Sequence, residues 1–379
     1  MTPPGLRWAA GWLVLLGAAS MAYAQAPTGP ITPAPGTPIQ QAPQESRIVT
    51  QVSLVNTPVT VRNSKGQMVP DLEEKNFRIT DNGVAQKISH FDLGGDPLSL
   101  VILVETSARI APLFQAVQKT GSVLTEQVMG PEAEAAVIGF NDSVDKLLDF
   151  TKDHDAVQKT INKLKNGPSG SKLYDAMAVG VEMLSGRPLP SADTPGRRRV
   201  MLIISEATDV GSETGLGAVL RRAQLTNVTI YSVGLSTTAA AFKADPKDVR
   251  HRSQPPGTFP QPPLPGTIQT PTTEDTRYGG GNIMQAVIWA VQHVKDTVKA
   301  NPLEMVTAGT GGTHIAAFKD DSIQRAIDEI GGELHSQYSV SYTPVGVNAS
   351  GYHEIKISVN RKDLKVRARP GYYLAPPGS

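Results

Sequence analysis

One segment constrains the fold of this chain more than any other. The apolar run from Leu98 to Val104 ends abruptly in Glu105, Thr106 and Ser107. The run is too short to cross a membrane, and its branched residues predict a strand buried on both faces of a parallel sheet. Small oxygen-bearing side chains at the carboxyl end of such a strand lie where open α/β sheets bind ligands. The segment therefore predicts a fold class and the edge of the sheet at which a site would lie.

The chain from residue 97 to 334 alternates predicted strands with predicted helices. We expect strands at 98–104, 135–140, 199–205 and 228–235, and helices at 110–128, 153–164, 174–184, 216–225, 282–300 and 321–334. This order predicts an α/β domain with a doubly wound, mostly parallel sheet covered by helices on both faces. A Pro- and Gly-rich segment at 243–281 interrupts the order and is expected to form a disordered surface insertion.

Short predicted strands flank this domain on both sides. Four lie within 47–95 and three within 335–374, and the Asn82-Gly83 pair indicates a hairpin in the first group. About seven strands are typical of an immunoglobulin-like sandwich. One interpretation is therefore a smaller β-sandwich domain built from both ends of the chain, with the α/β domain inserted between them. Two separate β elements are the competing interpretation, and pairing between the flanks distinguishes the two.

The amino-terminal residues predict export. Residues 1–24 follow the order of a cleavable secretory signal, with Arg7, an apolar core and then Ala22-Tyr23-Ala24. Residues 25–46 are rich in Pro and Gln and predict a disordered linker. The chain has no cysteine, and export without disulfides suits a bacterial envelope protein. We expect a periplasmic or extracellular protein with no membrane span after signal cleavage, because no later segment is long and apolar enough.

Three motifs stand in order along the α/β segment: Glu105-Thr106-Ser107-Ala108-Arg109, Gly170-Ser171-Lys172-Leu173-Tyr174-Asp175, and Ser205-Glu206-Ala207 with Asp209 close behind. They resemble the metal-ion-dependent adhesion site of von Willebrand factor A (vWA) domains, whose first motif is Asp-x-Ser-x-Ser. The resemblance covers residues 97–332 and implies a Rossmann-like fold that works by binding. The flanks, including Arg369-Pro370-Gly371-Tyr372, look like a vWA-related family of secreted proteins abundant in Acidobacteria.

The resemblance implies a degenerate site for Mg²⁺ or Ca²⁺, with Glu105, Ser107, Ser171 and Glu206 as ligands. Glutamate replaces aspartate at two of these positions, and Mg²⁺ demands near-octahedral geometry at about 2.0–2.1 Å. Arg109 stands where the family has a serine ligand, and a guanidinium group does not deprotonate in proteins.

Two hypotheses follow for this site. In the first, which we favour, Arg109 replaces the metal and forms an ion-pair cluster with the two glutamates. In the second, Arg109 turns to solvent and the four residues bind a cation loosely. Arg109 and Asp209 are the candidates for ion pairing or for contact with a partner.

The sequence has no pattern that supports an enzyme. Its seven histidines form no His-Glu-x-x-His pair, and no Gly-x-Ser-x-Gly motif or thiol is present. His314 has no visible partner, Gly309–Gly312 predicts a turn before the last helix, and Arg197–Arg199 predicts either an exposed turn or a site for an anionic partner.

The balance of 36 basic and 35 acidic residues implies no nucleic-acid partner. We expect no cofactor beyond the Mg²⁺ or Ca²⁺ just described. The chain is expected to be a non-enzymatic binding or adhesion protein that recognises a protein or cell-envelope component. The alternative is a structural module of an envelope complex whose cleft is inert.

Overall fold

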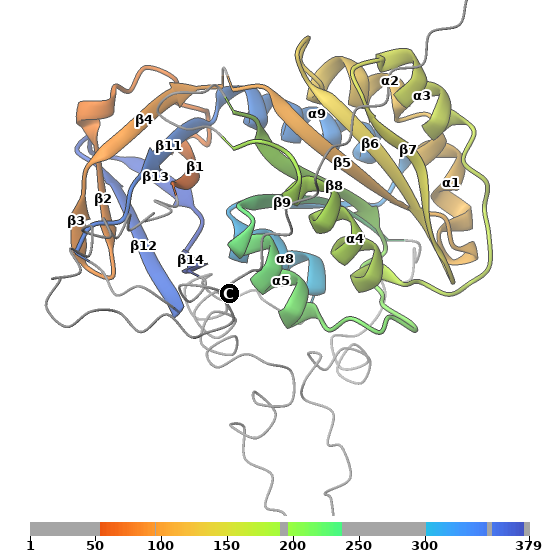
Figure 1. Ribbon diagram of the computed structural model, residues 1–379. Helices are drawn as coiled ribbons and strands as arrows, with labels where there is room; N and C mark the ends of the chain where they lie inside the picture. Colours follow the sequence, from red (N-terminus) through yellow and green to blue (C-terminus); the bar gives the residue numbers. More distant parts are fainter. Residues whose placement is uncertain (1–53, 95, 190–195, 237–300, 347–350, 375–379) are drawn as a thin grey trace, which may run out of the picture. The chain divides into compact units, whose positions relative to one another are not determined.

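The computed structural model describes residues 54–94, 96–189, 196–236, 301–346 and 351–374. The predicted signal at 1–24, the linker at 25–46, the insertion at 243–281 and the helix at 282–300 lie outside the described residues. Figure 1 shows that the described residues form an α/β region and a β region built on separate sheets. No helix among these residues is both long enough and apolar enough to cross a membrane.

The α/β region is organised around a six-stranded sheet in the order β10-β9-β8-β5-β6-β7. The strands are β5 (Leu98–Glu105), β6 (Glu134–Phe140), β7 (Val144–Thr151), β8 (Arg198–Ser205), β9 (Val228–Leu235) and β10 (His314–Ala317). All neighbours pair in parallel except β6 and β7, which are antiparallel. The sheet is therefore mixed, with one antiparallel edge strand on an otherwise parallel core.

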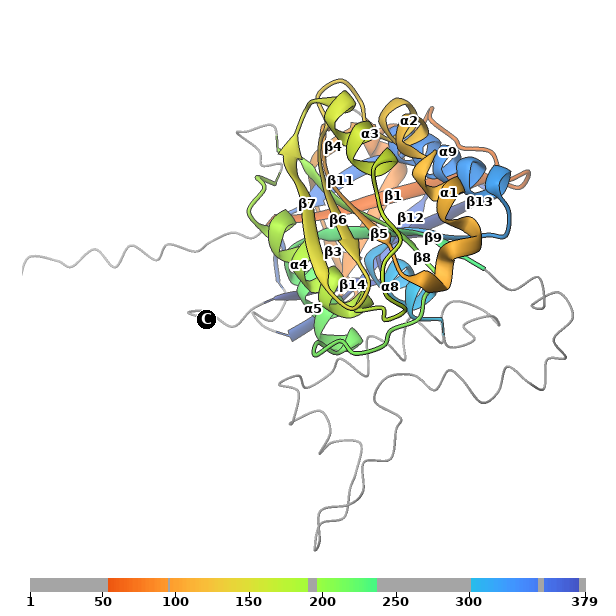
Figure 2. The same cartoon turned by 90° about the vertical axis from the view of Figure 1, so that its right-hand side faces the viewer.

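Helices cover both faces of this sheet (Figure 2). One face carries α1 (Ala111–Gln118), α2 (Gly121–Val123), α3 (His154–Asn162) and α9 (Asp320–Ser336). The other carries α4 (Leu173–Ser185), α5 (Leu216–Leu225) and α8 (Pro302–Thr310). Strand β5 sends Leu100 and Ile102 into the first core and Val101 and Leu103 into the second, so it is buried on both faces as its sequence predicts.

Two expectations for this region are wrong in detail, and two strands were missed. The helix expected at 110–128 is broken into a 3₁₀ turn, α1, α2 and a π-helical turn at Leu124–Val128. Gly309 lies inside helix α8, and Gly311 ends that helix with a φ of 87°, so the segment is more than a turn. Strands β7 and β10 were not expected, because β7 is largely exposed and β10 has only four residues.

The β region consists of two four-stranded sheets, ordered β13-β1-β11-β4 and β14-β12-β2-β3. Its strands are β1 (Val55–Asn63), β2 (Phe77–Asp81), β3 (Val84–Gln86), β4 (Ile88–Leu93), β11 (Tyr338–Tyr342), β12 (Gly351–Val359), β13 (Leu364–Ala368) and β14 (Gly371–Leu374). Strands from the two flanks pair directly, β1 with β11 and β13, and β2 with β12. Both sheets contribute to one apolar core, so the flanks form a single β region rather than two separate elements.

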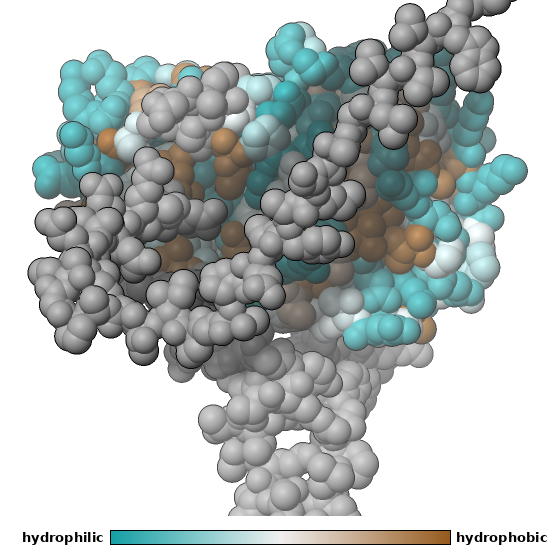
Figure 3. All heavy atoms as spheres, in the orientation of Figure 1, coloured by the Kyte–Doolittle hydropathy of each residue, from teal (hydrophilic) through white to brown (hydrophobic). Residues whose placement is uncertain are grey.

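Two local features position these strands. Asn82 and Gly83 both have positive φ, 47° and 82°, at the turn that joins β2 to β3, as the Asn-Gly pair predicts. A short 3₁₀ turn (Glu74–Asn76) precedes β2. On the face shown in Figure 3, the described residues include both hydrophilic and hydrophobic ones, as is usual for the surface of a folded domain.

A buried carboxylate lies where the two regions meet. Glu333 of α9 is 2 % exposed, accepts a hydrogen bond from Arg62 of β1 at 3.2 Å and pairs with Arg367 of β13. The Thr313 hydroxyl also donates to Glu333, at 3.2 Å. Because each donor comes from a different segment, this carboxylate ties the β region to the α/β region.

The exposed turn expected for Arg197–Arg199 is wrong, because the structure places these residues at and before the start of β8. Arg197 donates to the carbonyl of Leu98, Arg198 to that of Leu334, and Arg199 to those of Arg187 and Thr226. Arg198 is 5 % exposed. The three arginines therefore hold backbone carbonyls together and do not form an exposed turn.

Candidate functional site

The candidate site lies at the carboxyl ends of β5 and β8, which are adjacent parallel strands. From β5 the chain continues to β6 on one side, whereas β8 lies on the other side, so the strand order reverses here. Open α/β sheets bind ligands at such a reversal. We call this part of the molecule the carboxyl edge. It contains the ends of β5 and β8, the loop before α4, and the loop from Glu206 to Ser212.

Glu105 is fully buried, as are Ser107 and Ser171. One carboxylate oxygen accepts from the Ser107 hydroxyl at 2.5 Å. The other accepts from the Ser205 hydroxyl and from the Glu206 backbone N–H, both at 2.8 Å. Three donors therefore hold the carboxylate, which joins the end of β5 to the end of β8.

Ser107 has a second role at the start of the next turn. It is the N-cap of the 3₁₀ turn Ala108–Ile110, and its hydroxyl oxygen accepts from the Arg109 N–H at 3.3 Å. This cap directs the chain, and with it the Arg109 side chain, over the carboxyl edge.

Arg109 pairs with Glu206 across the edge. Its Nε lies 3.2 Å from the Glu206 carboxylate, and its Nη2 lies 3.4 Å from the Thr208 hydroxyl. The side chains are 36 % and 19 % exposed. The expected ion pair therefore forms with one glutamate, while hydroxyl and amide donors hold Glu105.

Ser171 and Asp209 lie on the loops beside this pair. The Ser171 hydroxyl is fully buried and finds no hydrogen-bond partner among the described residues, and its backbone carbonyl accepts from the Val210 N–H at 2.7 Å. Asp209 accepts from the Tyr174 N–H at 2.9 Å and from the Ser212 hydroxyl at 2.7 Å. Asp209 therefore stabilises the first turn of α4 and does not pair with Arg109.

This donor set fits a resident divalent cation poorly. The Glu105 oxygens and the Ser107 hydroxyl are committed to one another and to backbone donors, and the Arg109 guanidinium lies against Glu206. The buried Ser171 hydroxyl is the one feature that suits a ligand. Within the described ranges, no group of three or more His, Asp or Glu side chains is placed to hold a metal ion.

The loop after β8 has a strained backbone. Ala207 adopts a φ of 65°, a left-handed conformation that costs a residue with a Cβ atom roughly 1–2 kcal/mol. Its N–H donates to the Ser205 hydroxyl at 3.1 Å, which fixes the loop to the strand end. Val210 lies further along the same loop, and 51 % of its surface is exposed. Strain of this kind persists where the surroundings determine the conformation, as at binding sites.

His314 has partners that its sequence context does not reveal. Its Nδ1 lies 2.8 Å from the Ser232 hydroxyl, and its Nε2 lies 3.4 Å from the Asn301 amide. Parallel pairing of β9 with β10 places Ser232 and His314 opposite each other, although 82 residues separate them. Burial lowers the pKa of His314 to about 4. Because Ser232 is fully buried, the pair is not placed to attack a substrate.

Comparison with known families identifies the domain. The family model of the von Willebrand factor type A domain matches residues 100–208, and the observed mixed α/β sheet agrees with that fold. The chain therefore carries a vWA domain. No curated protein sequence matches the chain.

Several solved structures match parts of this chain at low sequence identity. Conserved hypothetical protein BatB from Bacteroides thetaiotaomicron is 11 % identical with a TM-score of 0.36 and covers 62 % of this chain and 98 % of its own. An aerotolerance-related membrane protein from Bacteroides fragilis is 12 % identical with a TM-score of 0.37 and the same coverage. The VWA domain of SpRpn10 is 18 % identical with a TM-score of 0.31, covering 38 % of this chain and 78 % of its own.

Proposed function

We propose that this vWA-containing chain is an exported, non-enzymatic binding protein that captures a protein or envelope partner at the carboxyl edge. The partner presents a carboxylate to Arg109. The site is a degenerate form of the metal-ion-dependent adhesion site, in which the guanidinium supplies the positive charge that a metal ion would supply.

The exposure of Arg109 is the observation that carries this proposal. Its Nε is paired with Glu206 and its Nη2 makes a long contact to Thr208, while Nη1 makes no hydrogen bond to another described residue. More than a third of the side chain is exposed. Guanidinium groups bind carboxylates through two parallel N–H donors, so the outer side of Arg109 can receive one while Glu206 keeps Nε.

The neighbouring loop suggests what accompanies the carboxylate. Val210 is exposed on the strained loop that also provides Thr208 and Glu206. An aliphatic group next to the carboxylate would pack on Val210 and remove apolar surface from water. We therefore expect a partner segment with an acidic group beside an aliphatic side chain.

The remaining parts of the proposal rest on the sequence. The pattern of residues 1–24 supports export to the periplasm or beyond, and the flanking motifs support membership of the vWA-related secreted family of Acidobacteria. We assign the β region as an immunoglobulin-like scaffold that carries the inserted vWA domain, because its two sheets share one core.

Calorimetry and partner capture test this proposal together. We expect the purified chain to show no micromolar binding of Mg²⁺, Mn²⁺ or Ca²⁺, because the Arg109 charge opposes a cation at the same edge. Capture of a partner from the native envelope should persist in chelator and should be lost in Arg109→Ser. A Lys172→Ser variant, which removes a positive charge from the loop before α4, is the matched control.

Two outcomes would overturn the proposal. Micromolar metal binding by the unaltered chain would favour the metal site formed by Glu105, Ser107, Ser171 and Glu206. Unaltered capture in both Arg109→Ser and Glu105→Ala would favour the structural module with an inert cleft. Three donors within the protein already bind the Glu105 carboxylate, and this observation supports the structural module as the second candidate.

A further inference from the structure

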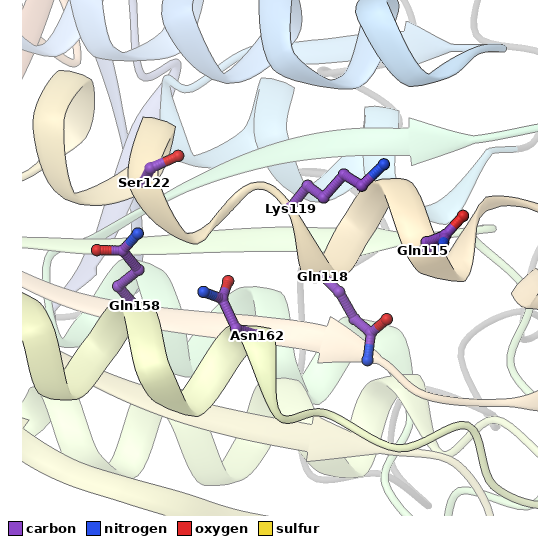
Figure 4. A pocket seen from close by; sticks show the side chains of 6 residues that line it. All are labelled: Gln115, Gln118, Lys119, Ser122, Gln158 and Asn162. Carbon is purple, nitrogen blue, oxygen red and sulfur yellow. The ribbon is translucent and has the colours of Figure 1, made fainter.

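A polar groove lies away from the carboxyl edge, between α1 and α2 on one side and α3 on the other (Figure 4). Its volume is about 500 Å³. Figure 4 shows Gln158 and Asn162 reaching from α3 toward α1 and α2, and Gln118 reaching back toward α3. The six lining residues are Gln115, Gln118, Lys119, Ser122, Gln158 and Asn162.

The chemistry of this groove is unusual for a helix surface. Four of its six side chains are primary amides, and none is a carboxylate or an aromatic ring. Solvent-facing helix surfaces ordinarily carry charged residues, and pockets for apolar small molecules are lined by hydrophobic side chains. Primary amides both donate and accept hydrogen bonds. Apart from Lys119 the lining is uncharged, so the groove suits a ligand whose own surface is rich in polar, hydrogen-bonding groups.

Two of the amides are held in place by the scaffold. Gln118 donates through Nε2 to the Leu164 carbonyl at 2.8 Å. The Asn162 amide nitrogen, turned toward the backbone, donates to the carbonyl of Gln118 at 2.7 Å and of Gln158 at 3.3 Å. Both amide nitrogens are thus bound to backbone carbonyls, which fixes the two side chains and reduces the ordering entropy lost when a ligand binds.

The close approach of α2 to α3 keeps the groove in this shape. A Cβ atom at Gly121 would lie 2.9 Å from the Asn162 side-chain amide and 3.0 Å from the Gln158 carbonyl. Only glycine therefore allows α2 to approach the Gln158 backbone and the Asn162 side chain this closely. The more exposed Gln115 and Lys119 flank the fixed pair on α1 and its C-terminal end.

We propose that this groove binds an oligosaccharide. Sugar hydroxyls donate and accept as amides do, so each can pair in either sense with the amides of Gln115 and Gln158. A peptide would be recognised through pockets for its side chains, and the lining offers no apolar pocket of that kind. This site is independent of the carboxylate-binding site proposed at the carboxyl edge.

Titration of the full chain with tetra-N-acetylchitotetraose tests the proposal. We expect saturable binding, followed by calorimetry and by saturation-transfer NMR. Gln158→Ala and Gln115→Ala should each weaken binding about fivefold or more, the effect of one lost hydrogen bond. Gln158→Glu, which keeps the shape but removes the amide donor, should weaken it as well. Gln324→Ala, an exposed glutamine on α9, is the matched control and should bind like the unaltered chain.

Several results would overturn it. The first is that a folded chain, with an unaltered melting temperature, shows no saturable binding of the tetrasaccharide, maltohexaose or cellohexaose. The second is that the Gln158 variants and the control bind with equal affinity. Tighter binding of a Gly-Ser peptide of equal length would assign the groove to a peptide backbone instead. Because Arg109→Ser leaves this groove untouched, failure here is distinguishable from failure of the function proposed for the carboxyl edge.

Discussion

Two arginine–carboxylate groups in this molecule use the same chemistry in different surroundings. At the carboxyl edge, Arg109 pairs with Glu206, and the two side chains are 36 % and 19 % exposed. At the junction of the β and α/β regions, Glu333 is 2 % exposed and is held by Arg62, Arg367 and a threonine hydroxyl. The junction carboxylate has its donors and no access to water, whereas the edge pair keeps open N–H groups. Burial of the carboxylate therefore separates a structural joint from an accessible binding group.

Removing the buried carboxylate should produce the largest effect. Glu333→Ala leaves Arg62 and Arg367 facing each other without their shared partner, and we expect a loss of about 3 kcal/mol in the free energy of unfolding. Urea denaturation measures it. The control is Glu329→Ala, because Glu329 is 56 % exposed and lies 3.8 Å from the same Arg62. That change should stay within about 0.5 kcal/mol, and equal losses in the two variants would contradict the role assigned to burial.

His314 extends the comparison to a buried group whose partners, Ser232 and Asn301, are neutral. Burial lowers its pKa to about 4, so the folded state holds it neutral. Between about pH 6.5 and pH 4 the unfolded chain takes up a proton that the folded chain refuses, so stability falls as the pH falls. The loss reaches on the order of 3 kcal/mol at the lower limit.

The matching variant is His314→Asn, which keeps a polar group opposite Ser232 but cannot take up the proton. Melting temperatures measured from pH 7 to pH 4.5 should fall less steeply for this variant than for the unaltered chain. Parallel profiles would show that His314 remains accessible to protons in the folded state.

The sequence predicts the elements of this fold better than it predicts the site. Strand 228–235 and helix 216–225 were expected within the bounds observed for β9 and α5, because their apolar patterns are local and regular. Strand β7 was missed because its face toward solvent carries residues such as Lys146 and Asp149, which hide the apolar pattern.

The contacts of the site depend on residues far apart in the chain. Arg109 and Glu206 are separated by 97 positions, and only the adjacency of β5 and β8 brings them together. His314 and Ser232 are also far apart in the chain, so the sequence did not reveal their contact. Asp209 was expected to form an ion pair or to contact a partner, yet its carboxylate accepts a hydrogen bond from the Tyr174 backbone N–H. Residue type therefore identified the edge of the sheet, while the pairing within it required the tertiary structure.

Glu105 tests whether a buried carboxylate at the carboxyl edge stabilises the fold as Glu333 does at the junction. Its two oxygens accept from Ser107, Ser205 and the Glu206 N–H, so Glu105→Gln turns an amide NH₂ toward at least one of these donors. We expect a loss of about 2 kcal/mol in the free energy of unfolding, measured in urea. Glu213→Gln, an exposed change on the adjacent loop, should have no measurable effect. A loss no larger than that of the control would mean that solvent reaches Glu105.

The smallest effect on stability should come from the residue on which the proposed function depends. Arg109→Ser removes a half-exposed ion pair, and such pairs contribute about 0–1 kcal/mol, so the melting temperature in metal-free buffer should barely change. Excess Mg²⁺ should then raise the melting temperature of this variant but not that of the unaltered chain, because only the variant lacks the opposing charge and a bound ion stabilises the folded state. A loss of about 2 kcal/mol or more in the free energy of unfolding would show that the Arg109–Glu206 pair stabilises the fold as Glu333 does. A rise with Mg²⁺ in both proteins would show that Arg109 does not exclude the metal, and the positive charge at this edge would then have to come from the ion.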